Sequence, residues 1–122
     1  MPFADEMRAR TFTFAADCVL FCRSLSREPD TRDLGRQLLK AGTSVAANYR
    51  AACRGRSRRE FVAKLGIAVE EADETVFWLE LIERAGVSRP EVVRPLRGEA
   101  GELLAILSKS LRTAKENLRT RE

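Results

Sequence analysis

The acidic residues at positions 70–74 are the first side chains in this sequence whose types and spacing could do chemistry. Glu70, Glu71, Asp73 and Glu74 are close enough on a helix to hold a hard metal ion. The chain has no histidine, which removes the commonest general base, the Ser–His and Cys–His nucleophile pairs, and the Glu-x-x-His pairs of di-metal helical bundles. We therefore expect no catalytic residue, no metal and no cofactor. We interpret the cluster as a solvated face that pairs with arginines, and an all-carboxylate metal site remains as the alternative.

Arginine and lysine residues form two basic clusters in a chain with a net charge of +4. The first cluster surrounds a predicted turn, where Arg58 and Arg59 would lie at an unfavourable helix N-terminus. The second follows one face of the last predicted helix. Such clusters attract phosphate backbones in a salt-dependent, largely sequence-independent way, although exposed basic residues are also ordinary solvated surface. The candidate nucleic-acid-binding residues are Arg50, Arg54, Arg56, Arg58, Arg59, Lys109, Arg112, Lys115 and Arg119.

The cysteines and the apolar segments indicate where the protein works. The sequence has three cysteines, shows no signal-peptide pattern, and has no apolar run near the ~20 residues of a membrane span. Cys18 and Cys22 are one helical turn apart, a spacing that does not suit a disulfide within a helix, so we assign them to the core. We expect a cytoplasmic protein with no membrane partner.

The elements that must position these residues are helices. The chain is rich in Ala, Leu, Arg and Glu, and its apolar residues recur at three- and four-residue steps. Pro29, Gly55 and Gly86 separate four helical segments, at about 5–27, 31–54, 58–86 and 90–119. The pattern predicts an all-α fold, an antiparallel up-down-up-down four-helix bundle, with residues 1–122 as a single domain.

Helix caps and the core are predicted in the same way. Asp30 or Thr31 would cap the second helix, and the sequences 57–60 (SRRE) and 88–91 (SRPE) each have the form of a capping box. Pro95 should kink the last helix or divide it. The residues predicted to face the core include Phe14, Cys18, Phe21, Leu34, Leu38, Val45, Tyr49, Leu65, Ala68, Ala72, Val76, Leu79, Val92, Leu96, Leu103, Leu107 and Leu111.

Small residues in the second helix and large ones on the third indicate how helices meet. Gly42, Ser44, Ala46 and Ala47 leave space for another helix backbone to approach closely. The third helix carries apolar residues on a second flank, beyond the single stripe that a bundle requires. Aromatic residues on such a flank suggest a contact between subunits, with coverage by the fourth helix as the alternative. The candidate interface residues are Ile67, Glu71, Glu74, Phe77, Trp78 and Leu81.

Three segments carry a resemblance to a known family. The sequences 42–52 (GTSVAANYRAA), 57–65 (SRREFVAKL) and 70–81 (EEADETVFWLEL) resemble the four-helix-bundle family of the 23S rRNA intervening-sequence proteins. The resemblance implies a cytosolic homopentameric ring, related in fold to the accessory proteins of diversity-generating retroelements, which bind nucleic acid and a reverse transcriptase. By matching positions it implies structural or interface roles for Asn48, Glu60 and Glu74, beside the predicted cap Ser57, and it supplies no catalytic residue.

Together these features predict a non-catalytic homo-oligomer that binds RNA or DNA weakly through its arginine-rich surface. The alternative is a protein-interaction scaffold, for example a subunit that resembles a reverse-transcriptase accessory protein, with no direct nucleic-acid role. The two hypotheses differ in the partner, which is a nucleic acid in the first and a second protein in the other.

Overall fold

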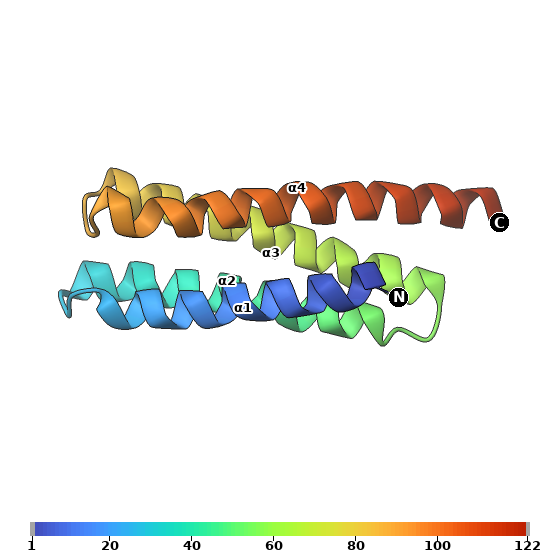
Figure 1. Ribbon diagram of the computed structural model, residues 1–122, viewed down its shortest axis with the longest axis horizontal. Helices are drawn as coiled ribbons and strands as arrows, with labels where there is room; N and C mark the ends of the chain where they lie inside the picture. Colours follow the sequence, from blue (N-terminus) through green and yellow to red (C-terminus); the bar gives the residue numbers. More distant parts are fainter. Residues whose placement is uncertain (1, 122) are drawn as a thin grey trace.

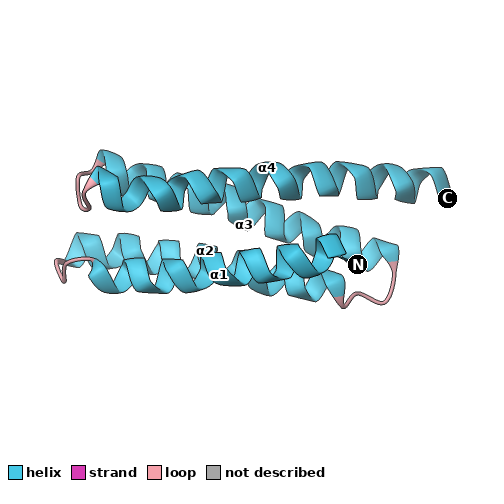
Figure 2. Cartoon of the chain, viewed as in Figure 1, coloured by secondary structure: helices cyan, strands magenta, loops and turns pink. Residues whose placement is uncertain are grey.

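The computed structural model describes residues 2–121, so Met1 and Glu122, the ends of the predicted domain, lie outside the described residues. Its helices are α1 (Pro2–Ser24), α2 (Pro29–Cys53), α3 (Arg58–Arg84) and α4 (Pro90–Arg121). No strand occurs between residues 2 and 121, and short loops join the helices (Figure 2). The protein is an all-α four-helix structure, as the sequence predicts.

The helices pack in chain order. Helix α2 packs against both α1 and α3, and α3 packs against α4, while α1 and α4 touch much less. Figure 1 shows the α1–α2 and α3–α4 turns at one end of the molecule. The α2–α3 turn and the C-terminal part of α4 lie toward the other end.

The first turn differs from its prediction. Helix α1 ends at Ser24 rather than near residue 27, and α2 begins at Pro29. Neither Asp30 nor Thr31 caps α2; Glu28 precedes the helix and makes no side-chain cap bond. The reason is that proline at the first helical position has its φ angle already set and has no N–H that needs a partner. The helix therefore starts before the residues expected to cap it.

The turns before α3 and α4 have similar sequences, but only the first contains the predicted serine cap. The hydroxyl of Ser57 accepts a hydrogen bond from the backbone N–H of Glu60 at 3.1 Å, which confirms the predicted cap of α3. Gly86 follows α3 with a φ of 73°, where glycine is favoured. At α4 the carbonyl of Arg89 accepts from Val93, so Arg89 and not Ser88 occupies the cap position. The predicted second capping box is wrong because Pro90 starts the helix one residue too late for Ser88 to reach it.

The core lies between the helices and largely matches the predicted stripes. Phe14, Leu38, Leu65, Leu79 and Leu107 are all 2% exposed or less. In α4 the structure corrects one residue: Val93 is fully buried, whereas Val92 is 39% exposed. Val93 continues the three- and four-residue steps through Leu96, Ala100, Leu103 and Leu107, which keep one face of the helix against α3. Pro95 does not divide α4, which is continuous on both sides of it.

Gly42 lies at a close approach between α1 and α2. A Cβ atom at this position would lie 2.6 Å from the sulfur of Cys18, inside van der Waals contact. The buried thiol of Cys18 therefore occupies the space that the glycine leaves. This confirms that the small residues of α2 allow a neighbouring helix to come close.

Candidate nucleic-acid interface and subunit faces

The α2–α3 turn presents a group of exposed arginines. Arg54 follows the last residue of α2, Arg56 lies in the turn, and Arg58 is the first residue of α3. These three arginines are exposed to solvent, and so are the other two predicted members of the cluster, Arg50 on α2 and Arg59 on α3. Exposed guanidinium groups in this position can contact a large anionic partner without any change in the helices.

The structure brings the second basic cluster to the same end of the molecule. Lys109, Arg112, Lys115 and Arg119 are exposed on the C-terminal half of α4, which extends toward the α2–α3 turn (Figure 1). A hollow of about 220 Å³ joins the two elements, because Arg58 and Phe61 of α3 line it together with Ala114 and Asn117 of α4. We call this region the basic end; it comprises Arg54, Arg56, Arg58, Arg59, Lys109, Arg112, Lys115 and Arg119.

Several arginines elsewhere in the bundle pair with carboxylates. Arg10 of α1 reaches Glu99 at 2.7 Å and Glu102 at 2.9 Å on α4. Glu83 at the end of α3 lies 2.8 Å from Arg94 and 3.0 Å from Arg97. These pairs tie α4 to its neighbours, so their charges serve the bundle itself.

The flank of α3 that was predicted as an interface is open to solvent in the single chain. Ile67 is 38% exposed, Phe77 53% and Leu81 36%. Helix α4 therefore leaves these three apolar residues uncovered. Trp78 is half-buried; its ring lies edge-on to Phe77 with the centroids 4.9 Å apart, and its Nε1 donates to Glu74 at 3.2 Å. We call Ile67, Glu71, Glu74, Phe77, Trp78 and Leu81 the α3 face.

A short polar chain connects the α3 face to α2. The amide of Asn48 donates to the hydroxyl of Ser44 at 2.8 Å and to its carbonyl at 2.9 Å, within the same helix. Burial, and then the neighbouring charge of Glu74, raise the pKa of Glu71, while Lys40 and a hydrogen bond from Ser44 act in the opposite direction. Asn48 thus helps to orient the hydroxyl of Ser44, which hydrogen-bonds to the carboxylate of Glu71. Carboxylates remain crowded on this face.

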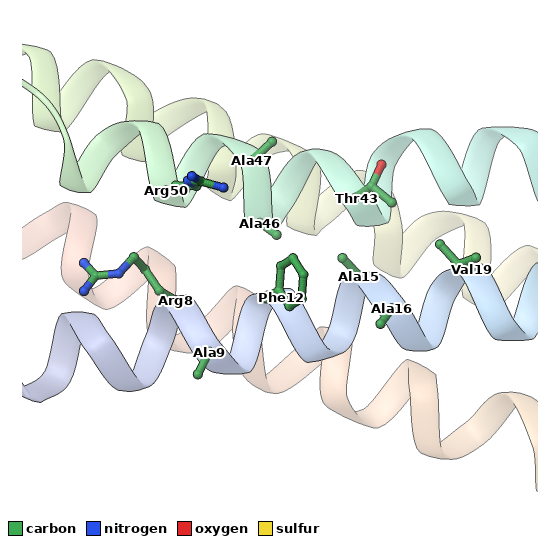
Figure 3. Close-up of a pocket in the computed structure, with 10 residues that line it drawn as sticks. All are labelled: Arg8, Ala9, Phe12, Ala15, Ala16, Val19, Thr43, Ala46, Ala47 and Arg50. Atoms are coloured by element: carbon green, nitrogen blue, oxygen red, sulfur yellow. The ribbon is translucent and has the colours of Figure 1, made fainter.

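An apolar groove between α1 and α2 was not predicted from the sequence. It encloses about 640 Å³ and is visible in Figure 3, with Phe12 lying between the two helices. Phe12 is 69% exposed and is surrounded mainly by alanines. Arg8 and Arg50 lie together toward one end of the groove. The groove is lined by Arg8, Ala9, Phe12, Ala15, Ala16, Val19, Thr43, Ala46, Ala47 and Arg50.

A signal for this groove was present in the sequence. Phe12 and Val19 lie about two helical turns apart on one flank of α1, away from the stripe of Phe14, Cys18 and Phe21. Alanines follow on the facing flank of α2, as Ala46 and Ala47. Small residues at these positions predict close helix packing, and the pattern alone does not show the space left beside them.

The remaining groups with chemical potential are thiols and carboxylates. Burial raises the pKa of Cys18 to about 12 and that of Cys22 to about 11, and the thiol of Cys22 donates to the carbonyl of Gly35 at 3.3 Å. Both thiols are therefore protonated near neutral pH. Among residues 2–121, no three Cys, Asp or Glu side chains come together in a way that could hold a metal ion. In that same range no helix is both long and apolar enough to cross a membrane.

Comparisons with known proteins agree with this architecture. The family model of the 23S rRNA-intervening sequence proteins matches residues 6–109. A crystal structure of a protein with unknown function from the S23 ribosomal protein family of Bacteroides thetaiotaomicron VPI-5482 is similar, with 30% sequence identity and a TM-score of 0.82. The match covers 89% of this chain and 97% of that one. The curated proteins contain no match.

Proposed function

Because this chain belongs to the family of the 23S rRNA-intervening sequence proteins, we propose that it is a non-catalytic, homo-oligomeric bundle that binds RNA or DNA weakly through its basic end. The observation that carries the proposal is the meeting of two basic clusters, distant in sequence, at one end of the molecule. A large anionic partner at this end would contact exposed cations of both elements. Contacts of this kind read the phosphate backbone and its shape rather than the bases.

The proposal includes the assembly of the chain. We infer that the four helices form an antiparallel up-down-up-down bundle, which the positions of the three turns at alternate ends support. We further infer that the copies form a homopentameric ring in the cytoplasm. Such a ring would repeat the basic end around its circumference and would multiply weak contacts into measurable binding.

The experiment compares two triple variants with the same loss of charge. The first changes Arg54, Arg56 and Arg58 to Ala at the basic end. The matched control changes Arg23, Arg27 and Arg32 to Ala near the α1–α2 turn, at the opposite end of the bundle, where all three are also exposed. Binding to a fluorescent RNA duplex and to a DNA duplex is measured by anisotropy across a salt series.

We expect native binding to fall steeply with salt and the basic-end variant to bind at least tenfold more weakly. Its salt slope should decrease by about 3, since each lost phosphate contact lowers the slope by about 1. The control should resemble the native protein. Equal losses in both variants would mean that net charge alone acts, and absence of native binding at low ionic strength would refute nucleic-acid binding by this protein.

A further inference from the structure

The single chain leaves two apolar surfaces open, one on each side of α2. The α1–α2 groove lies on the side of α1, where Phe12 and Ala46 are found. The α3 face lies on the other side, where the charge of Lys40 and a hydrogen bond from Ser44, both on α2, act on Glu71. The two surfaces do not overlap, so both could be occupied at once.

These surfaces are complementary in size. The groove is built mainly from alanines, which leave about 640 Å³ unfilled. The α3 face has the opposite character, because its exposed apolar side chains are the large ones of Ile67, Phe77 and Leu81. Large side chains of one helix that enter spaces between small residues of others form the close-packed contacts of stable interfaces.

They are also complementary in charge. Arg50 and Arg8, the latter paired with Asp5 on its own helix, lie toward one end of the groove, whereas Glu71 and Glu74 lie on the α3 face. Burial and the neighbouring Glu74 raise the pKa of Glu71, against the opposing effects of Lys40 and Ser44. Arginines of a second copy would place positive charge beside these two carboxylates.

We propose that the α1–α2 groove of one copy receives the α3 face of the next copy, in a head-to-tail contact. This inference rests on the proposed homo-oligomer and names the surfaces that build it. A symmetric contact of groove with groove would bring arginines together, and one of α3 face with α3 face would bring glutamates together. The head-to-tail arrangement avoids both and propagates around a ring, because each copy then offers one surface of each kind.

The test uses two variants that each block one surface. The groove variant carries Phe12→Glu and Ala47→Glu, and the face variant carries Ile67→Glu and Leu81→Glu. All four positions are exposed, and glutamate on both sides prevents the altered surfaces from attracting each other. The control carries Leu20→Glu and Val92→Glu, two exposed apolar residues that line a different hollow, between α1 and α4.

Masses are measured by light scattering after size-exclusion chromatography, and folding by circular dichroism. We expect the native protein and the control to form the same oligomer and each blocked variant to have the mass of one chain. An equimolar mixture of the blocked variants should form a one-to-one heterodimer, because the mixture retains a single intact groove-to-face contact. Should a blocked variant fail to fold, Phe12→Ser and Leu81→Ser take the place of the two pairs.

The other outcomes separate the two proposals. If the native protein is an oligomer but the mixture yields only single chains, or if either blocked variant keeps the native mass, the head-to-tail contact is wrong while the homo-oligomer stands. If the native protein itself has the mass of one chain, both the homo-oligomer and the contact are wrong.

Discussion

At the scale of single residues, one close contact between α1 and α2 depends on the absence of a side chain. Gly42 of α2 faces Cys18 of α1, and an added Cβ would lie 2.6 Å from the sulfur and 3.3 Å from the Cβ of Cys18. Cys18 is fully buried and its side chain is too short to move aside. The close approach of α1 and α2 at this point therefore depends on the glycine and the thiol packed against it.

We predict that Gly42→Ala lowers the free energy of unfolding by about 1–3 kcal/mol, the usual cost of overpacking a core. Gly66→Ala is the matched control, since nothing lies within 4 Å of the added atom. The control should stabilise α3 by about 0.5–1 kcal/mol, because alanine loses less backbone entropy than glycine. Urea unfolding of both variants measures the difference.

A second substitution tests the cause of the loss. Adding Cys18→Ala to Gly42→Ala removes the clashing sulfur and should recover part of the stability. If Gly42→Ala is as stable as Gly66→Ala, the close approach of α1 and α2 is not as described.

At the scale of elements, two similar sequences begin α3 and α4 in different ways. Ser57 and Glu60 precede and open α3, and the serine hydroxyl satisfies the Glu60 amide. In the sequence SRPE the proline moves the start of α4 so that Arg89 takes the cap position and Ser88 precedes it. Serine at the same place in two similar sequences thus caps one helix but not the other.

We predict that Ser57→Ala costs about 1 kcal/mol of stability, the typical value of a lost N-cap. Ser88→Ala is the control and should change the free energy of unfolding by less than about 0.5 kcal/mol, as for a substitution away from a specific contact. Chemical denaturation of the two variants distinguishes the roles, and equal losses would contradict the assignment of the caps.

At the scale of the whole molecule, the bundle is held unevenly. Contacts between α1 and α4 are far fewer than those of the other packed helix pairs. Arg10 spans this side of the bundle, with Nε and Nη2 donating to the two oxygens of Glu99 at 2.8 and 2.7 Å. A bidentate pair of this kind is stronger than a single exposed ion pair and also fixes geometry.

We predict that Arg10→Met lowers the free energy of unfolding by about 1 kcal/mol and loosens the contact between α1 and α4. Arg36→Met is the control, because Arg36 pairs with Asp33 within one helix at 3.8 Å and both are exposed. Its effect should be close to zero. Hydrogen exchange should show faster opening of the middle of α1 in the Arg10 variant alone; unchanged exchange there would mean that apolar packing alone closes this side.

Much of the fold can be predicted from the sequence by rules that involve only neighbouring residues. The four helices, the cap at Ser57, the stop at Gly86 and the core positions of Leu38 and Leu107 follow from residues within a turn or two of each other. Local rules fail where two signals compete. Pro29 begins α2 before Asp30 and Thr31, the residues expected to cap it. Pro90 begins α4 so that Arg89, and not Ser88, takes the cap position.

The candidate surfaces depend on tertiary structure. Periodicity places Ile67 and Trp78 on one flank of α3, but only the positions of α2 and α4 decide that Ile67 stays exposed while Trp78 is half-buried. Likewise, the sequence places Arg58 and Ala114 far apart, and the packing of α4 on α3 brings them to one hollow. A helix side chain has a direction fixed by its sequence position, whereas its surroundings are fixed by the helices that pack beside it. For that reason the sequence alone determined the elements and their apolar faces, and the tertiary structure decided the groove at Phe12 and the basic end.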